Sequence, residues 1–144
     1  MIAVILISHS DFAASLKKAS EMVYGPQEAL AAIGLYGDAG LESLAAEIRA
    51  QYDAFAAEGY QVICLTDLPH ATPYNAALIA LDGTDSRIVS GMNLPMLVQI
   101  LSEREDVEPD GIDEFLESAA ETAKESIEVC STVSADEEEE EDDF

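Results

Sequence analysis

An unbroken apolar run from Ile2 to Ser8, rich in β-branched residues, opens the chain. In a strand with one face in water, apolar and polar residues alternate, whereas a continuous apolar run is typical of a strand that is buried on both faces. Strands buried in this way occur almost only in parallel sheets that carry helices on both sides. The run therefore predicts an α/β fold.

The remaining sequence switches repeatedly between helix-like and strand-like patterns. Apolar residues recur at spacings of three and four between further short apolar runs, which is the pattern of amphipathic helices that separate strands. Pro73 and Pro95 suit the first turns of two of these helices. The predicted strands are 2–8, 29–36, 60–66 and 87–90, and the predicted helices are 12–24, 41–58, 73–81, 94–104 and 110–129. This order predicts a mostly parallel central sheet with helices on both faces.

The end of the chain differs from the rest in composition. All eight residues from Asp136 to Asp143 are acidic. We therefore expect residues 134–144 to form a disordered, solvated tail behind a single domain of residues 1–133. Residues 127–133 fit either the end of the last helix or a short strand.

The charge of the chain is strongly unbalanced, with 30 acidic and 6 basic residues and a net charge of −24. Without the eight residues of the acidic run, 22 acidic residues remain against 6 basic ones, a net charge of −16. Such a surface repels nucleic acid and anionic lipid, which we exclude as partners, and attracts a basic protein surface. An equally good explanation is that the acidity only keeps the protein soluble in a salty cytoplasm.

The first residues and the two cysteines indicate a cytoplasmic protein. The apolar run that ends at Ile7 is too short for a signal peptide or a membrane span, and no basic region accompanies it. Cys64 lies in an apolar run and is expected to be buried and inert, and Cys130 follows the last predicted helix. Their spacing is not that of a metal site, and two cysteines do not indicate a disulfide framework.

Ligand sites of open α/β sheets lie beyond the carboxyl ends of the strands. The segments to inspect are therefore those that follow the four predicted strands, namely 8–11, 37–40, 67–73 and 91–93. Both histidines of the chain, His9 and His70, fall within these segments. The topology thus brings them to the same edge of the sheet.

His9 stands between a buried strand and the beginning of a helix. The free N–H groups of residues 10–13, near Ser10, form an anion site of the kind found at helix N-termini. A histidine beside such a site can carry a phosphoryl group on one ring nitrogen if an acceptor holds the other nitrogen and fixes the tautomer. Asp67 is the candidate acceptor, and Thr72 is a candidate both for capping the next helix and for touching a phosphate oxygen.

Each of these residues also has a simpler interpretation. His9 can be a surface histidine, Asp67 a turn residue, Thr72 only a helix cap and Asn93 only a loop-stabilising residue. His70 is interpreted first as a bystander on its loop and second as an added donor to a phosphate. A third interpretation, a metal site with His9 and Asp67, has no support in the sequence spacing.

Three stretches of the sequence resemble a known family. Residues 2–10 (Ile-Ala-Val-Ile-Leu-Ile-Ser-His-Ser) resemble a family strand that ends in a histidine, usually as Gly-Thr-His-Gly. Residues 67–77 (Asp-Leu-Pro-His-Ala-Thr-Pro-Tyr-Asn-Ala-Ala) resemble Asp-Leu-x-Gly-Gly-Ser/Thr-Pro-Phe-Asn-Ala-Ala, and residues 90–97 (Ser-Gly-Met-Asn-Leu-Pro-Met-Leu) resemble Gly-Val-Asn-Leu-Pro-Met-Leu. Over residues 1–130 the chain thus resembles the IIA component of mannose-type sugar phosphotransferase systems, which includes the mannose, fructose and sorbose group.

The resemblance implies a phosphotransferase that acts as a phosphohistidine carrier. His9 would accept a phosphoryl group from HPr and pass it to a histidine of a IIB component, from which the membrane components IIC and IID deliver it to the sugar. Asp67 would hold the His9 ring, and Ser10, Thr72 and nearby backbone amides would hold phosphate oxygens, with no metal or organic cofactor. The family also exchanges a C-terminal strand across a homodimer, and residues 127–133 are the candidate for that strand.

The sequence departs from the family pattern at the loop after the third strand. His70 and Ala71 replace the Gly-Gly pair behind Pro69, and Ser8 and Ser10 stand where Thr and Gly are usual. Two alternatives follow: the phosphoryl-donor subunit of a dihydroxyacetone kinase system, which also carries Ser-His-Ser, and a regulatory IIA-like module without efficient transfer. An acidic scaffold is a third. Further candidates at the site are His70 and Asn93, and the expected docking contacts are Phe12, Leu68 and Met92.

Overall fold

β1 (Ile2–His9) lies in the middle of a four-stranded parallel sheet, with β2 (Leu30–Leu35) on one side and β3 (Gln61–Thr66) on the other. β4 (Arg87–Ser90) pairs with β3 and forms an edge, so the strand order is β2-β1-β3-β4. The computed structural model describes residues 1–132, and the predicted tail of residues 134–144 lies outside them.

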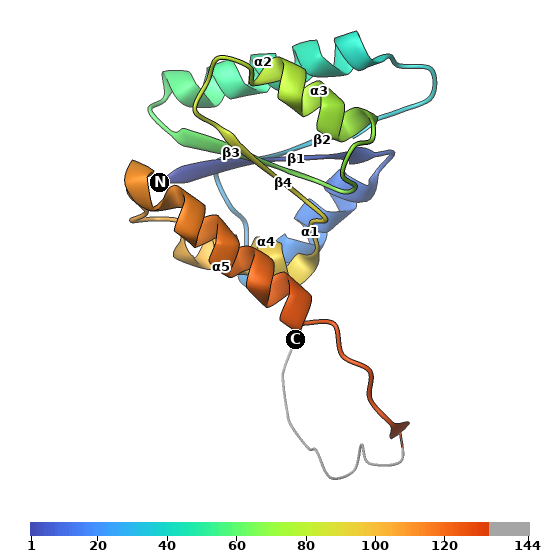
Figure 1. The fold of residues 1–144 in the computed structure, drawn as a ribbon, viewed down its shortest axis with the longest axis vertical. Coiled ribbons are helices and arrows are strands. Elements are labelled where there is room, and N and C mark those ends of the chain that lie inside the picture. Colours follow the sequence, from blue (N-terminus) through green and yellow to red (C-terminus); the bar gives the residue numbers. More distant parts are fainter. Residues whose placement is uncertain (133–144) are drawn as a thin grey trace.

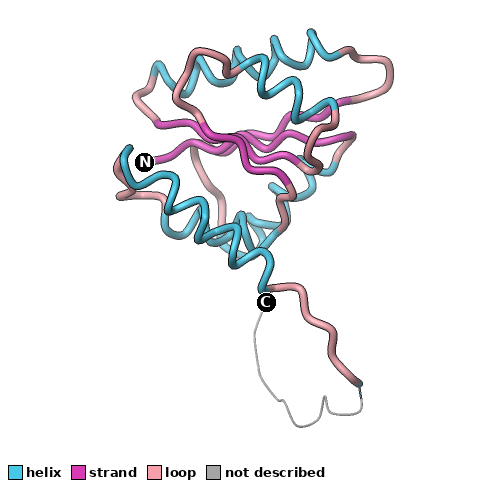
Figure 2. The backbone as a smooth tube through the Cα atoms, viewed as in Figure 1, coloured by secondary structure: helices cyan, strands magenta, loops and turns pink. Residues whose placement is uncertain are grey.

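Two helical layers cover the sheet (Figure 1). One layer consists of α2 (Leu41–Ala57) and α3 (Thr72–Ala80). The other consists of α1 (Phe12–Tyr24), α4 (Leu94–Glu103) and α5 (Ile112–Glu125), with a short 3₁₀ helix, η1 (Pro109–Gly111), before α5. Figure 2 shows the strands enclosed between these layers, which confirms the predicted α/β fold with helices on both faces.

The buried side chains of β1 alternate between two hydrophobic cores. Ala3, Ile5 and Ile7 lie in the core on the α2/α3 side, whereas Val4 and Leu6 lie in the core on the other side. Every residue from Ile2 to Ser8 is fully buried. The continuous apolar run therefore reflects a strand buried on both faces, as the sequence predicts.

The last predicted helix ends earlier than expected. α5 stops at Glu125, and no strand forms over residues 127–132, while Val133 lies outside the described residues. Ile127 is 76% exposed and Val129 is 100% exposed. In a single copy of the chain, neither the sheet nor a helix covers this segment.

A buried arginine ties together the amino end of the sheet. Arg104 is only 3% exposed. Its Nη1 donates to the carbonyl oxygens of Ile2 and Ala29, each at 2.9 Å, and its Nη2 donates to the Glu28 carbonyl at 2.6 Å and to Oε1 of Gln27 at 3.1 Å. Burial lowers the pKa of Arg104, although nearby Tyr and Glu groups raise it. Ala29 has a φ of 53°, so Arg104 holds a left-handed residue just before β2.

No helix within residues 1–132 has the length and apolar character needed to cross a membrane.

Candidate active site

His9 is the last residue of the central strand and the first exposed residue after its buried run. It pairs in register with Leu35 of β2, and the preceding Ile7 pairs with Thr66 at the end of β3. The residue after Thr66 is Asp67, so the strand order itself brings Asp67 beside His9. The sequence predicts this neighbour, because it places Asp67 at the end of the strand next to the first one.

One carboxylate oxygen of Asp67 holds His9 at two points. Oδ2 accepts the His9 backbone N–H at 2.9 Å and lies 2.8 Å from the ring atom Nδ1. Oδ1 accepts the N–H of Leu68 at 2.9 Å. The side chain of His9 is 46% exposed, whereas that of Asp67 is 13% exposed. The pair thus sits at the surface, with its carboxylate inward and its ring outward.

The ionisation of Asp67 fixes the tautomer of the His9 ring. Burial raises the pKa of this carboxyl, but the hydrogen bonds and charge of His9 and the N–H of Leu68 outweigh burial and hold the pKa below its ordinary value. At neutral pH Asp67 is therefore a carboxylate, which can only accept. Nδ1 must then carry the proton and donate it, so the lone pair of the ring lies on Nε2.

Ser8 joins the end of β1 to the beginning of α1. Its buried Oγ accepts the N–H of Ala13 at 2.7 Å and donates to the carbonyl of His9 at 3.0 Å. The N–H of Ser10 is also used within the fold, since it donates to the Leu35 carbonyl at 2.7 Å. Of the four N–H groups that the sequence offers for an anion, the structure leaves those of Asp11 and Phe12 without a partner among the described residues.

The end of β2 contacts the His9 segment in a way that the sequence analysis missed. The phenol O–H of Tyr36 donates to Oδ1 of Asp11 at 2.7 Å. This hydrogen bond, together with partial burial and acidic neighbours, raises the pKa of Tyr36, so its O–H stays protonated and able to donate. A Cβ at Gly34 would overlap the carbonyl oxygen of Ser10 and lie 2.8 Å from the Tyr36 ring. A glycine is therefore required where β2 passes the turn after His9.

The loop after β3 takes a left-handed conformation at His70, although its sequence has no glycine there. His70, which stands where the family pattern has glycine, has a φ of 64°. Histidine is among the non-glycine residues more often found in this region. The ring of His70 packs edge-on against Tyr74, with centroids 5.2 Å apart and planes at 63°. His70 thus takes a positive φ, which glycine would also permit, and adds a ring contact with Tyr74.

Thr72 does not cap α3, contrary to one of its predicted roles. The helix begins at Thr72 itself, and Ala71, in extended conformation, precedes it without any side-chain cap. The half-buried Thr72 therefore lies in the first turn, at the same edge of the sheet as Asp67. Its proposed contact with a phosphate oxygen stays a prediction.

Asn93 has a structural role, but as the cap of a helix rather than as the loop-stabilising residue of its simpler interpretation. Its Oδ1 accepts the N–H of Met96 at 3.0 Å and so caps α4, while its Nδ2 donates to the Ala123 carbonyl of α5 at 3.4 Å. Met92 is 4% exposed and lies in the hydrophobic core. The prediction that Met92 contacts a docking partner is therefore wrong, because its side chain packs inside the core.

A metal site at His9, His70 and Asp67 has no geometric support. Among the described residues, no group of three or more His, Cys, Asp or Glu side chains comes together to hold an ion. Cys64 is buried in β3, and burial raises its pKa to about 12, so the prediction of an inert thiol is confirmed. Cys130 is exposed.

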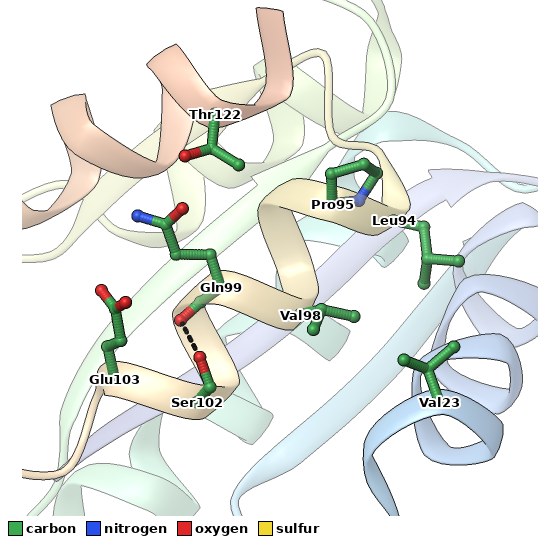
Figure 3. A pocket seen from close by; sticks show the side chains of 8 residues that line it. All are labelled: Val23, Leu94, Pro95, Val98, Gln99, Ser102, Glu103 and Thr122. Atoms are coloured by element: carbon green, nitrogen blue, oxygen red, sulfur yellow. Dashed lines mark hydrogen bonds between the residues drawn. The ribbon is translucent and has the colours of Figure 1, made fainter. Parts of the chain in front are cut away.

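An apolar hollow of about 380 Å³ lies between α1, α4 and α5 (Figure 3). No candidate site residue lines it. The residues that line it are Val23, Leu94, Pro95, Val98, Gln99, Ser102, Glu103 and Thr122. The hollow therefore does not extend the site around His9.

Comparison with known proteins decides the family. The family model of the fructose IIA component of the phosphotransferase system (PTS) matches residues 3–120. The chain belongs to the mannose-type PTS IIA family. The fructose-specific EIIA component of Bacillus subtilis strain 168 is 32% identical over 133 residues, which is 91% of this chain and 88% of that protein.

A further relative agrees with this assignment, and a solved structure agrees with the fold. The mannose-specific EIIAB component of Escherichia coli K12 is 33% identical over 128 residues, which is 88% of this chain but 38% of that longer protein. A crystal structure of a phosphotransferase system EIIA component from Streptococcus agalactiae superposes with a TM-score of 0.77 at 21% identity, over 90% of this chain and 97% of that one. This chain is thus a IIA component of a sugar phosphotransferase system, and the resemblance read from its three motifs is confirmed.

Proposed function

We propose that the chain is a phosphoryl carrier of the phosphoenolpyruvate-dependent sugar PTS, which accepts phosphate from HPr on Nε2 of His9 and passes it to a IIB component. The observation that carries this proposal is the pairing of Nδ1 with the Asp67 carboxylate at 2.8 Å, on a ring that is 46% exposed. Nδ1 is held by Asp67, and Nε2 has no hydrogen-bond partner within residues 1–132. That is the arrangement required of a nucleophilic histidine.

The transfer itself needs no further chemical group. The lone pair of Nε2 attacks the phosphorus of the donor's phosphohistidine, and the new N–P bond forms as the donor's N–P bond breaks, with its electrons returning to the donor ring. The proton on Nδ1 stays in place. Positive charge that builds up on the His9 ring is stabilised by the Asp67 carboxylate. Transfer to IIB is the same step with the roles of donor and acceptor exchanged.

Helix N-termini at this edge supply partners for the phosphate oxygens. The N–H groups of Asp11, the N-cap, and of Phe12, the first residue of α1, lie at the start of that helix. Ser10, the residue before them, adds a hydroxyl. Thr72 begins α3 with its own N–H and hydroxyl. Because the positive end of a helix dipole favours an anion, these groups would hold the phosphate next to His9.

The docking surface for HPr would surround His9 at the carboxyl end of the sheet. Phe12 is 47% exposed and Leu68 is 54% exposed, and the first follows β1 while the second follows β3. Acidic groups flank them, and a basic partner would be attracted by them. The membrane components IIC and IID would receive the phosphate only through IIB, so the carrier would work in the cytoplasm.

We also propose that the chain forms a homodimer in which residues 127–133 of one copy pair with the edge strand of the other. Within the described residues β4 pairs only with β3, so its outer edge is open. A shallow groove runs along it, lined by Ile88, Val89 and Leu116 among others. Ile127 and Val129 are apolar and exposed. Light scattering should show a dimer for the full chain and a monomer after truncation behind Ser126. A truncated chain that is still a dimer would contradict this role of the segment.

The decisive experiment is phosphorylation of the purified protein by phosphoenolpyruvate, enzyme I and HPr, followed by mass spectrometry. We expect one acid-labile phosphate on the peptide that contains His9, no phosphate on His9→Ala, and retained labelling of His70→Ala. If the folded protein stays unmodified while a known IIA component is labelled in parallel, the carrier proposal fails. The regulatory alternative, motivated by the altered loop of residues 69–71, would then account for the protein. Labelling lost only in His70→Ala would show that the wrong histidine is assigned.

A further inference from the structure

We infer that Tyr36 is a positioning residue for His9, because its phenol O–H, through Asp11, fixes the turn that joins the histidine to α1. This inference rests on the proposed function and deepens it. It adds a residue on a third strand end to the pair formed by His9 and Asp67.

The turn after His9 is in a conformation that needs support. Ser10 has a φ of 52°, in the left-handed region that side chains other than glycine disfavour. Residues in this region persist where the surrounding structure holds them, and such positions cluster at functional sites. Ser10 directly follows His9, so the conformation of the turn determines where the chain leaves the histidine.

The end of β2 supplies that support from one side. The Leu35 carbonyl accepts the N–H of Ser10 at 2.7 Å, and the Tyr36 phenol donates to Asp11 at 2.7 Å. The close approach of the Ser10 carbonyl to Gly34 places the turn directly against the strand. Two successive residues of the turn are thus bonded to two successive residues of the β2 segment.

The end of β3 holds His9 from the other side. Asp67 binds both the backbone N–H of His9, at 2.9 Å, and its ring, at 2.8 Å. His9 is therefore held between two attachments, Asp67 before the turn and Tyr36 after it. If the hydrogen bond between Tyr36 and Asp11 is lost, the turn can relax. The N–H groups of Asp11 and Phe12 then no longer keep a fixed position relative to His9.

Tyr36→Phe tests this role, because it keeps the ring and removes only the hydroxyl. At saturating HPr we expect the maximal rate of His9 phosphorylation to fall about two- to tenfold, the factor that corresponds to one hydrogen bond. The KM for HPr should change little, since the ring surface is retained. Tyr24→Phe, at an exposed tyrosine on the far end of α1, is the matched control.

Nuclear magnetic resonance (NMR) of the unphosphorylated protein tests the inference without phosphate transfer. Tyr36→Phe should shift the amide signal of Ser10 and the ring signals of His9, whereas Tyr24→Phe should leave them in place. Unchanged signals would overturn the inference, even if the carrier works. A maximal rate of His9 phosphorylation that Tyr36→Phe leaves unchanged would also overturn it. Failure of the parent protein to accept phosphate would reject the proposed function but leave the NMR comparison intact.

Discussion

A basic side chain is bound at each end of the central sheet, Arg104 at the amino end and His9 at the carboxyl end, and the two differ in what they leave unused. At the amino end all four hydrogen bonds of Arg104 go to Gln27 and three carbonyls, and the side chain is 3% exposed. At the carboxyl end His9 uses one ring nitrogen on Asp67, and its side chain is 46% exposed. A saturated, buried cation can only stabilise the fold, whereas a half-exposed ring with an unused nitrogen can react.

The two ends share a second feature, a left-handed residue beside a strand. Ala29 precedes β2 with a φ of 53°, and Ser10 follows β1 with a φ of 52°. Arg104 holds the first through the Ala29 carbonyl, and the end of β2 holds the second. The same disfavoured conformation is therefore held in place by the fold at one end and beside the site at the other.

Removal of the buried cation should give the largest effect. Arg104→Met removes all four of these hydrogen bonds, although the Ala29 carbonyl keeps the N–H of Val4 as a donor, and should lower the free energy of unfolding by about 2–4 kcal/mol. Phosphate uptake per folded molecule should not change. Urea unfolding measures the loss, and Arg87→Met, at an exposed ion pair with Asp113, should cost less than about 1 kcal/mol. Equal losses in both variants would remove the distinction between the two ends.

Removal of the carboxylate at the other end should affect the rate rather than the fold. Asp67→Asn loses the charge that orients His9 and should slow phosphorylation about 10- to 100-fold, by analogy with the partners that orient metal-bound histidines. A quench-flow measurement with HPr gives the rate. The matched control is Asp113→Asn, since the pKa of Asp113 is also lowered, by Arg87, but far from His9. Slowing in the control as well would show that surface charge, not orientation, is responsible.

The contribution of the Asp67 carboxylate to stability should depend on pH. Because the folded state lowers the pKa of Asp67, its contribution is fully present above the unfolded value of about 3.9 and is lost as the pH falls through the lower folded value. The difference in stability between the parent protein and Asp67→Asn should therefore be constant from pH 8 to pH 5 and shrink below about pH 4. Urea titrations at several pH values measure it. A difference that grows on acidification would contradict the assigned direction.

Relief of strain at the amino end should give the smallest effect. Ala29→Gly removes the steric cost of the left-handed conformation and should raise the free energy of unfolding by about 0.5–1 kcal/mol, since the greater freedom of unfolded glycine offsets part of the gain. The urea midpoint measures the change. A lower midpoint would mean that Arg104 already relieves the strain at Ala29.

The sequence predicts the fold well because its main signals are local. The apolar run of β1 and the helical spacing of the later segments set the order of elements, and the strand order then brings Asp67 to His9. The end of α5 is predicted too late, because the apolar residues Ile127 and Val129 continue the pattern without a surface to cover them.

What the sequence could not give depends on contacts between distant residues. Arg104 reads as the end of a helix, yet its partners lie some 75 to 102 positions away. Tyr36 and Asp11 are 25 positions apart and meet only because β2 lies beside β1. Thr72 precedes a proline, which is a capping signal, but the helix includes it. The local hint in the sequence is Gly34, two residues before Tyr36, because a glycine within a strand can mark the close approach of another backbone segment.

The burial of β1 has a kinetic consequence for the site. The amides of this central strand should be among the last to exchange with deuterated water, because they open only when the whole domain unfolds. His9 is the last residue of that strand. The proposed phosphoryl acceptor, His9, is thus part of the segment that unfolds least often. Successive partners would therefore bind the same site geometry each time.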